Sequence, residues 1–368
     1  MKYDYLIVGS GLFGSIFARQ MTDAGAKCLV IDKRKHIGGN CYTKNVNDIN
    51  VHEYGPHIFH TSSKRIWDYM NQWTQFNHFV YRPKVSYQNK LYAFPINLFT
   101  MYQLWGVQTP IEAEKKLNEV KLNIESPSNL EEWILSQVGE ELYHTFVYGY
   151  TKKQWGKSPN ELPASIIKRL PIRLNMDDNY FNDCYQGIPI GGYTAIFEKM
   201  LKDIPVEIGV DYLSEREYLN AKAKKIVYTG PIDEFFDYEH GMLEWRSLKF
   251  EHETLKLGDY QGNAVINYTE ETIPYTRVIE HKHFEFGKQN STVITKEYPQ
   301  KWDKDKEKFY PVNDEINNEL YNKYKQKINR DKFVFGGRLA DYKYYDMHQV
   351  VGSALERSAM EIKNDTLQ

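Results

Sequence analysis

The residues with the clearest chemistry lie within the first forty positions. Gly9, Gly11 and Gly14 form a GxGxxG pattern that follows the apolar run Tyr3–Val8 and precedes apolar residues at helical spacing. Such glycines permit a tight turn, a close approach of a pyrophosphate to the backbone, and close packing of a helix on a strand. Asp32 ends the next apolar run, and its carboxylate can accept hydrogen bonds from both ribose hydroxyls, which argues against a 2′-phosphate. This context predicts a dinucleotide site; the alternative is a strand–turn–helix unit that binds no nucleotide.

A second glycine pair indicates which dinucleotide is bound. Gly38 and Gly39 follow Asp32 at a spacing of six residues and are themselves followed by Asn40. An acidic residue followed by a glycine pair at this spacing resembles the FAD-binding family that includes the amine oxidases. The predicted cofactor is therefore FAD.

Further segments have the pattern of strands that belong to the same nucleotide-binding sheet. Lys225–Gly230 and Lys332–Gly337 are short apolar runs that end in glycine, and the second leads into a predicted helix over Gln349–Ile362. Strands of a doubly wound sheet meet their ligand at such carboxyl ends. We therefore expect a discontinuous nucleotide-binding domain assembled from the N-terminal, middle and C-terminal parts of the chain.

The intervening sequence contains two kinds of pattern, one typical of helices and one typical of strands. Ile111–Tyr150 has charges spaced for exposed helical faces, whereas Tyr81–Leu98 and Leu243–Lys296 contain short alternating runs typical of an antiparallel sheet. The predicted fold class is α/β, with a discontinuous Rossmann-like FAD-binding domain, a helical lobe and an antiparallel β-sheet lobe. The expected boundaries are 1–78, 185–240 and 321–368 for the FAD-binding domain, 79–100, 166–184 and 241–320 for the β-sheet domain, and 101–165 for the helical domain with its mobile loop.

Composition narrows the classes of partner. The 368 residues include 41% hydrophobic and 26% charged residues and carry a formal net charge of −2, so no bulk attraction to nucleic acid or to an anionic membrane is expected. An anionic substrate would need a local cluster of arginines. The three cysteines, Cys28, Cys41 and Cys184, do not form a disulfide framework or a CxxC metal site. With no apolar run of membrane-spanning length and no signal peptide, we expect a cytoplasmic protein.

Six further motifs occur in a fixed order along the chain. Together they resemble the bacterial UDP-galactopyranose mutases, a family of isomerases that interconvert the pyranose and furanose forms of a nucleotide-activated galactose for cell-surface polysaccharides. The resemblance implies a reduced FAD that forms a covalent adduct with the anomeric carbon, an external reductant, a nucleotide-sugar substrate and a homodimer. The motifs are Tyr54–Thr61, Gly149–Gly156, Glu161–Ala164, Lys168–Pro171, Pro274–Arg277 and Tyr344–His348.

The resemblance assigns roles to individual residues. In the implied catalytic group, Arg169 and Arg277 clamp the substrate diphosphate, for which a bidentate guanidinium is suited, and His60 lies beside the flavin and the sugar. The implied cofactor-binding residues are Gly9, Gly11, Phe13, Gly14, Asp32, Lys33, Gly39, Asn40, Tyr54, His57, Arg338 and Met347. The implied substrate-binding residues are Tyr81, Phe146, Tyr150, Thr151, Trp155, Tyr180, Arg246, Tyr310, Tyr344 and Asp346.

Several of these residues have a second interpretation from their types alone. Arg169 can belong to a solvated basic run, Trp155 can pack a helix end, and Arg246 can be a rim residue of a strand. Asp346 can cap the helix that follows it, and His57 can be a hydrogen-bonded core histidine.

The histidines also raise the question of a metal. His57 and His60 are three residues apart with no third ligand at a suitable spacing, and His281 and His283 lack cysteine or carboxylate partners in a metal pattern. We therefore expect no metal site.

The sequence departs from the family at Tyr81, where the family usually has an asparagine that faces the sugar. This substitution leaves related substrates open, such as UDP-N-acetylgalactosamine or dTDP-fucose. Two alternatives from other classes share the N-terminal pattern. One is an FAD-dependent oxidoreductase of the amine-oxidase type, which would consume oxygen. The other is a non-catalytic relative that resembles the Rab GDP-dissociation inhibitors and would be colourless.

Overall fold

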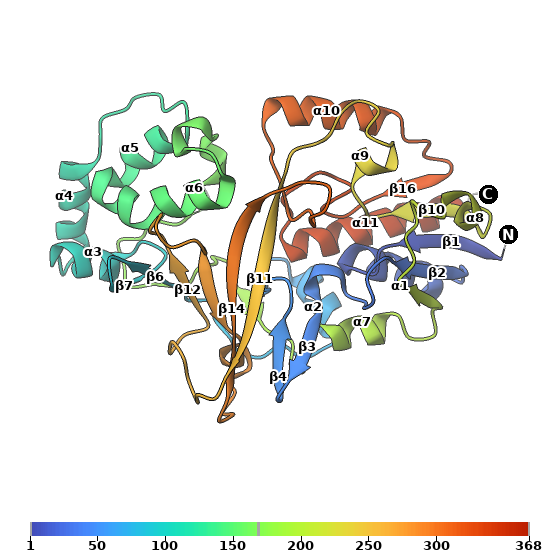
Figure 1. Cartoon of the computed structure of the whole chain (residues 1–368), viewed down its shortest axis with the longest axis horizontal. Helices are drawn as coiled ribbons and strands as arrows, with labels where there is room; N and C mark the ends of the chain where they lie inside the picture. Colours follow the sequence, from blue (N-terminus) through green and yellow to red (C-terminus); the bar gives the residue numbers. More distant parts are fainter. Residues whose placement is uncertain (1, 168–169, 367–368) are drawn as a thin grey trace.

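The structure is a computed structural model that describes residues 2–167 and 170–366. Figure 1 shows three parts side by side: a helical lobe, a central sheet with two long strands, and a sheet covered by helices on both faces. Both ends of the described chain lie in the third part.

A parallel sheet of five strands forms the core of the third part. Its order is β16-β10-β1-β2-β9, and its strands come from distant parts of the sequence, since Val8 pairs with Tyr228 and Tyr228 with Phe335. This arrangement confirms the prediction of a discontinuous Rossmann-like α/β fold. The strands are β1 (Tyr3–Val8), β2 (Cys28–Asp32), β9 (Val206–Ile208), β10 (Ala223–Tyr228) and β16 (Phe333–Phe335).

Helices bury both faces of this sheet because successive strand residues point to opposite sides. Ile7 and Val30 pack into one apolar cluster with α1, α2, α7 and α11, whereas Leu6 and Leu29 pack into another with α8, α9 and α10. The helices are α1 (Leu12–Asp23), α2 (Lys64–Asn71), α7 (Thr194–Met200), α8 (Arg216–Asn220), α9 (Ile232–Phe235), α10 (Glu315–Gln326) and α11 (Met347–Thr366).

The central sheet has the order β15-β11-β14-β13-β12-β6-β7. Its pairs are antiparallel as expected except one: β12 runs parallel to β6, with Asn267 opposite Val85. An alternating sequence pattern predicts a strand but not its direction. The long connection from β6 to β12 allows parallel or antiparallel pairing. The strands are β6 (Lys84–Tyr87), β7 (Lys90–Ala93), β11 (Trp245–Leu255), β12 (Val265–Tyr268), β13 (Arg277–Glu280), β14 (Thr292–Lys301) and β15 (Tyr310–Pro311).

The helical lobe packs on the β6–β7 end of this sheet around its own apolar cluster, which includes Met101, Ile134 and Phe146. It consists of α3 (Leu98–Trp105), α4 (Pro110–Val120), α5 (Leu130–Tyr143), a π-helical stretch (His144–Tyr148) and α6 (Gly149–Trp155). Two small antiparallel pairs complete the fold: β3 (Thr43–Val46) with β4 (Ile49–His52), and β5 (Phe59–Thr61) with β8 (Tyr185–Gly187).

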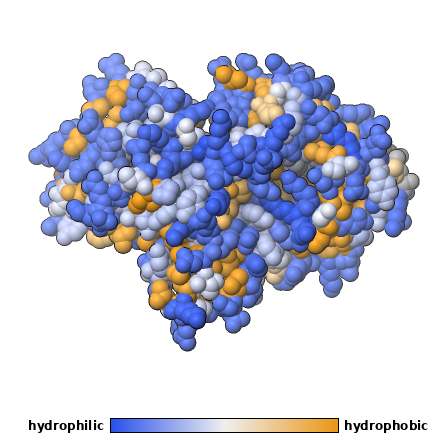
Figure 2. Space-filling view, in the orientation of Figure 1, coloured by the Kyte–Doolittle hydropathy of each residue, from blue (hydrophilic) through white to orange (hydrophobic). Residues whose placement is uncertain are grey.

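The surface in Figure 2 is mainly hydrophilic, with hydrophobic side chains scattered over it. Among residues 2–167 and 170–366, no helix combines the length and the apolar character that crossing a membrane requires.

Candidate functional site

A first cavity of about 410 Å³ opens at the carboxyl ends of the parallel strands. This is the edge where a doubly wound sheet binds its ligand. Of the residues implied for cofactor binding, the following line it: Gly9, Gly11, Phe13, Asp32, Lys33, Gly39, Asn40, His57, Arg338 and Met347.

The floor of this cavity is a glycine cradle at the N-terminus of α1. A Cβ atom added to Gly39 would lie 3.0 Å from the Cα of Gly11, so side chains there would fill the cradle. Gly11 is the N-cap of α1, no side chain caps that end, and no acidic residue stands in the first turn. The free N–H groups and the helix dipole therefore suit a pyrophosphate. Gly14 is outside the lining; its role is packing, because a Cβ there would lie 1.9 Å from the carbonyl oxygen of Gly9.

Asp32 is held at the rim of the cradle by local hydrogen bonds. Its Oδ2 accepts from the backbone N–H and the hydroxyl of Ser10, at 2.8 and 2.6 Å, and its Oδ1 accepts from the Arg34 N–H at 2.9 Å. The side chain is buried yet lines the cavity, which is the placement that a ribose-binding carboxylate needs.

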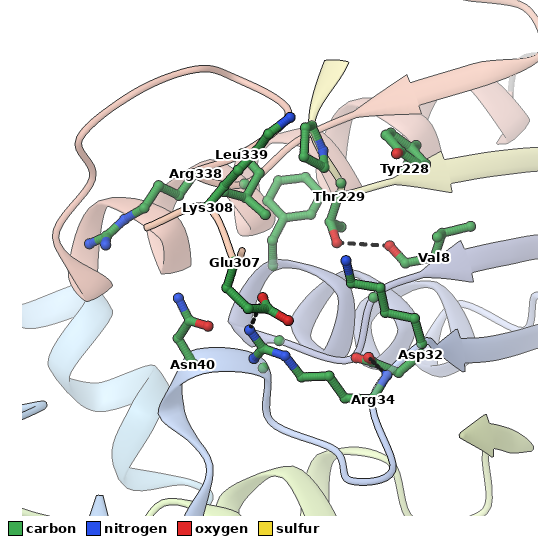
Figure 3. Close-up of a pocket in the computed structure, with 18 of the residues that line it drawn as sticks. Val8, Asp32, Arg34, Asn40, Tyr228, Thr229, Glu307, Lys308, Arg338 and Leu339 are labelled. Atoms are coloured by element: carbon green, nitrogen blue, oxygen red, sulfur yellow. Dashed lines mark hydrogen bonds and ion pairs between the residues drawn. The ribbon is translucent and has the colours of Figure 1, made fainter. Parts of the chain in front are cut away.

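An ion pair crosses the mouth of this cavity, as Figure 3 shows. Arg34 Nη2 and Glu307 Oε2 are 2.7 Å apart, and the guanidinium lies 4.3 Å from the ring centroid of Tyr54. Tyr54 does not line the cavity; it supports Arg34 and bonds to His36 at 2.7 Å. The sequence reasoning missed Arg34 and the 304–308 segment, which no nucleotide-binding pattern marks.

A second cavity, of about 390 Å³, lies between α6 and the central sheet. Among the described residues, its lining combines aromatic rings from several elements with Arg277. The predicted substrate or catalytic residues that line it are Tyr81, Phe146, Tyr150, Thr151, Trp155, Tyr180, Arg277 and Tyr344.

Arg277 is a cation with a buried partner in the lining of this second cavity, which Lys157 also lines. It begins β13, and its Nε forms an ion pair with Glu297 Oε1 at 3.2 Å, in register across β14. Its Nη2 donates to the Tyr150 hydroxyl at 2.5 Å. Burial raises the pKa of Tyr150 to about 12, so the phenol is neutral at pH 7. Two partners thus orient the guanidinium, a group whose planar fork suits a phosphate oxygen.

Two amide side chains in the same cavity were missed at the sequence level. Asn267 Oδ1 and Gln154 Oε1 are buried and have no hydrogen-bond partner among the described residues, although both side chains line the cavity. A buried polar atom without a partner is costly, and a ligand with N–H donors would satisfy both. A lone amide in a strand or helix has no distinguishing sequence pattern.

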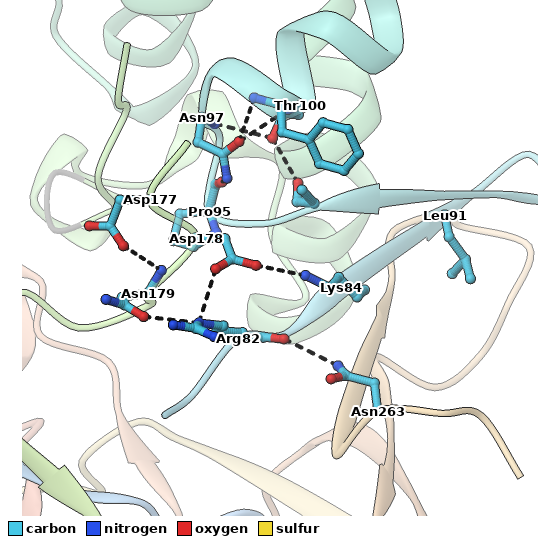
Figure 4. Close-up of polar contacts among 12 residues, drawn as sticks. Arg82, Lys84, Leu91, Pro95, Asn97, Thr100, Asp177, Asp178, Asn179 and Asn263 are labelled. Carbon is cyan, nitrogen blue, oxygen red and sulfur yellow. Dashed lines mark hydrogen bonds and ion pairs between the residues drawn. The ribbon is translucent and has the colours of Figure 1, made fainter. Parts of the chain in front are cut away.

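Tyr81 and Tyr180 form an aromatic wall, and the segments that carry them are tied together. The Tyr180 N–H donates to the Tyr81 carbonyl at 2.9 Å, and their ring centroids are 5.1 Å apart. Next to them, Asp178 accepts from Arg82 at 3.0 Å and from Lys84 at 2.9 Å (Figure 4). Hydrogen bonds and ion pairs thus join the segments that carry the wall, and Tyr81 is almost fully buried within it.

The two cavities are neighbours. Tyr344 lines the second and Tyr345 the first, and the Arg338 guanidinium lies 5.4 Å from the Tyr344 ring centroid and 5.9 Å from that of Tyr310. Tyr310 stacks on Tyr344 but does not itself line the second cavity. A ligand of the first cavity can therefore meet a ligand of the second near this segment.

Of the two predicted histidines, His57 lines the first cavity and His60 lines neither cavity. His57 Nδ1 donates to the Gly55 carbonyl at 2.8 Å, and burial lowers the pKa of His57 to about 4, so its ring is neutral. His60 Nδ1 lies 2.6 Å from Asp183 Oδ2, and its ring stacks on Phe181 with 3.6 Å between centroids. Asp183 was not singled out, because it is far from His60 in the sequence.

The structure corrects the statement that these histidines lack further ligand groups. Asp346 and His348 come close to His60, and Asp259 and Glu280 come close to His283. Asp346 and His348 are far from His60 in the sequence, and Asp259 is far from His283, so spacing could not reveal these neighbours; Glu280, in contrast, lies only three residues before His283. His283 Nε2 lies 3.2 Å from Glu280 Oε2, which gives that group a protein partner. The absence of a metal site stays a prediction.

Arg246 and Asp346 are two further predicted residues that line neither cavity. Arg246 is buried outside the cavity lining and donates to the Gln154 and Lys153 carbonyls at the end of α6, at 2.8 and 3.2 Å. Asp346 stands directly before α11 outside both linings, and its carbonyl accepts from the N–H groups of the first turn. Arg169 lies outside the described residues.

Comparison with known proteins gives consistent matches along the chain. The family model for UDP-galactopyranose mutase matches residues 145–344, and that for an NAD(P)-binding Rossmann-like domain matches residues 7–73. The chain is 42% identical to the dTDP-fucopyranose mutase of Escherichia coli, over 98% of each chain. It is 40% identical to a probable UDP-galactopyranose mutase of Klebsiella pneumoniae, over 95% of this chain and 92% of the relative. A crystal structure of reduced UDP-galactopyranose mutase shares the fold, with a TM-score of 0.76 and 15% identity over 97% of this chain and 93% of that one.

Proposed function

Because this chain belongs to the UDP-galactopyranose mutase family, we propose that it interconverts UDP-galactopyranose and UDP-galactofuranose. The main support for this proposal is the position of Arg277. Its guanidinium is held by Glu297 inside an aromatic cavity, and this cavity adjoins the glycine cradle of the first cavity. The enzyme is an isomerase, since the reaction changes ring size without net oxidation.

The cofactor is FAD, which the glycine cradle and Asp32 fit. In the reduced form, FAD would supply the nucleophile for the anomeric carbon. The chain binds the dinucleotide through the α1 N-terminus and retains it beneath the Arg34–Glu307 pair.

We assign the second cavity to the nucleotide sugar. Phe146 and Tyr150 offer ring faces to the base, and the amide oxygens of Gln154 and Asn267, which have no partner among the described residues, face its polar edge. Arg277 stabilises the diphosphate both in the bound substrate and when it departs as a leaving group. Tyr344 lines the second cavity on the side nearest the first cavity. The rings also exclude water, which would otherwise compete with the sugar hydroxyls.

The test is turnover by the FAD-loaded, dithionite-reduced protein. Arg277→Ala is expected to remove turnover, because one oriented charge on the diphosphate is worth roughly a hundredfold or more in rate, while the protein stays yellow. Arg330→Ala is the matched control, since this arginine is exposed and lies outside both cavities. Near-normal turnover by Arg277→Ala would refute the assignment of the second cavity.

A second substrate is favoured by one specific observation, the 42% identity to a dTDP-fucopyranose mutase. Tyr81 closes part of the cavity wall with an aromatic ring, which would suit a less polar sugar. Assaying UDP-galactose, UDP-N-acetylgalactosamine and dTDP-fucose side by side decides between them. A ratio of kcat/KM that favours dTDP-fucose would assign the enzyme to that substrate.

A further inference from the structure

Lys153 has an unusual environment at the junction of the helical lobe and the central sheet. Its side chain leaves α6 on the side of the turn 269–276, which connects β12 to β13. An ammonium has three N–H donors, and here four carbonyl oxygens share them. The acceptors are the carbonyls of Tyr268 (2.8 Å), Glu270 (2.8 Å), Ile273 (3.0 Å) and Tyr275 (3.0 Å).

The backbone of the same junction is tightly fitted. A Cβ atom on Gly149 would lie 2.1 Å from the Thr269 carbonyl oxygen, so only glycine allows this approach. The Thr269 hydroxyl donates to the Thr145 carbonyl at 2.6 Å. By contrast, the neighbouring Lys152 forms an exposed ion pair with Glu271 at 2.7 Å. The turn is therefore docked on α6, and Lys153 is the only one of these two lysines that is enclosed by it.

The four carbonyl groups need a cation between them. Their oxygens carry partial negative charges and converge on one point, so they repel one another when the ammonium is absent. Burial lowers the pKa of Lys153 to about 8, which leaves the side chain mostly protonated at pH 7. The curled shape of the turn thus depends on the charge of one side chain.

This junction connects the two sides of the second cavity. The helix α6 carries Tyr150, Gln154 and Trp155 into the cavity, and the turn continues directly into Arg277. We propose that Lys153 is a positioning residue that sets the distance between the base-facing side chains of α6 and the diphosphate-facing guanidinium of Arg277. This inference rests on the proposed function only for the identity of the ligand.

The experiment compares Lys153→Met with Lys152→Met in the FAD-loaded protein. Methionine keeps most of the length of the side chain without its donors, and Lys152 is the control on the same helix. Titration calorimetry with UDP is expected to give a dissociation constant raised roughly ten- to a hundredfold in Lys153→Met, because small displacements of binding groups have effects of this size. Lys152→Met should change it less than about twofold. Equal affinities in the two variants would overturn the proposal.

Two further measurements separate positioning from general stabilisation. Amide hydrogen exchange in 269–276 should accelerate in Lys153→Met at a temperature well below the midpoint of thermal unfolding, where the rest of the chain is protected. In Lys153→Ala, ammonium chloride should partly restore UDP affinity relative to tetramethylammonium chloride at equal ionic strength, because only the small cation fits the carbonyl cage. Unchanged exchange in the turn, or equal affinity in both salts, would overturn the proposal. If the wild type binds no UDP, the proposed function fails, and exchange in the turn still tests Lys153.

Discussion

Arg246 gives a sharp test of how the second cavity is built. Its guanidinium caps the carboxyl end of α6 through the Gln154 and Lys153 carbonyls and lies against Gly156, which has φ +64°. A Cβ atom on Gly156 would lie 2.7 Å from Arg246 Nη1. The structure thus places Arg246 behind α6 and outside the lining of the second cavity. The sequence alone also allowed direct contact with a substrate.

Arg246→Met removes two hydrogen bonds from a charged donor and keeps most of the apolar stem. Each such bond contributes about 1.5–3 kcal/mol, so the free energy of unfolding should fall by about 3 kcal/mol or more. The affinity for UDP should fall as well, by roughly tenfold, because α6 carries Tyr150 and Trp155 into the cavity.

The assay is urea unfolding of the FAD-loaded protein, followed by UDP titration of the same samples. Gly156→Ala provides the second side of a double-mutant cycle, because its methyl group would displace the guanidinium. The two substitutions should be non-additive by about 1 kcal/mol or more, since the Arg246→Met background leaves no guanidinium for Gly156→Ala to displace. A loss of UDP affinity with an unchanged free energy of unfolding would refute this reasoning and favour direct contact with the substrate.

Two further outcomes are expected. Asn267→Leu removes a buried amide oxygen without a partner, so UDP affinity should fall roughly tenfold while the free energy of unfolding stays the same or rises by about 1 kcal/mol; unchanged affinity would contradict the role of Asn267 in base recognition. Burial alone would raise the pKa of Glu280, but pairing with His283 and hydrogen bonds from Thr292 and two backbone N–H groups lower it to about 2. Because this pKa is depressed in the folded state, Glu280 contributes stability above pH 4.5, and this contribution is lost as the pH falls toward 2. Acid titration of Glu280→Gln should show a shallower loss of stability over that window; an unchanged slope would refute the assignment.

The sequence predicted the parts of the molecule whose geometry is local. Tyr3–Val8, the glycine turn and Asp32 are close in the chain, so their spacing alone predicts a strand, a glycine turn before a helix and an acidic side chain beside it, and the turn and Asp32 line the first cavity. The segments that became β10 and β16 were also recognisable, because each is a short apolar run that ends in glycine. Arg277 was identified through its motif, and the structure places it in the second cavity.

Partners that come from distant strands could not be predicted. Glu297 meets Arg277 only through the register of β13 and β14, and Asp183 meets His60 only through the fold around β5. Whether β12 pairs parallel or antiparallel with β6 depends on the end of the sheet from which the long connection leads into β12. None of these pairings leaves a periodic or spaced pattern in the chain.

The sequence by itself determined that this protein binds a dinucleotide and belongs with the sugar-nucleotide mutases, because these features reside in short motifs. Only the tertiary structure decided which oxygens surround the cations beside the second cavity: two carbonyls at the end of α6 for Arg246, and for Lys153 the Tyr268 carbonyl with three carbonyls of the 269–276 turn. The physical reason is that a cation's role depends on which buried carbonyl and carboxylate oxygens surround it. That environment arises only when the helical lobe and the central sheet pack together.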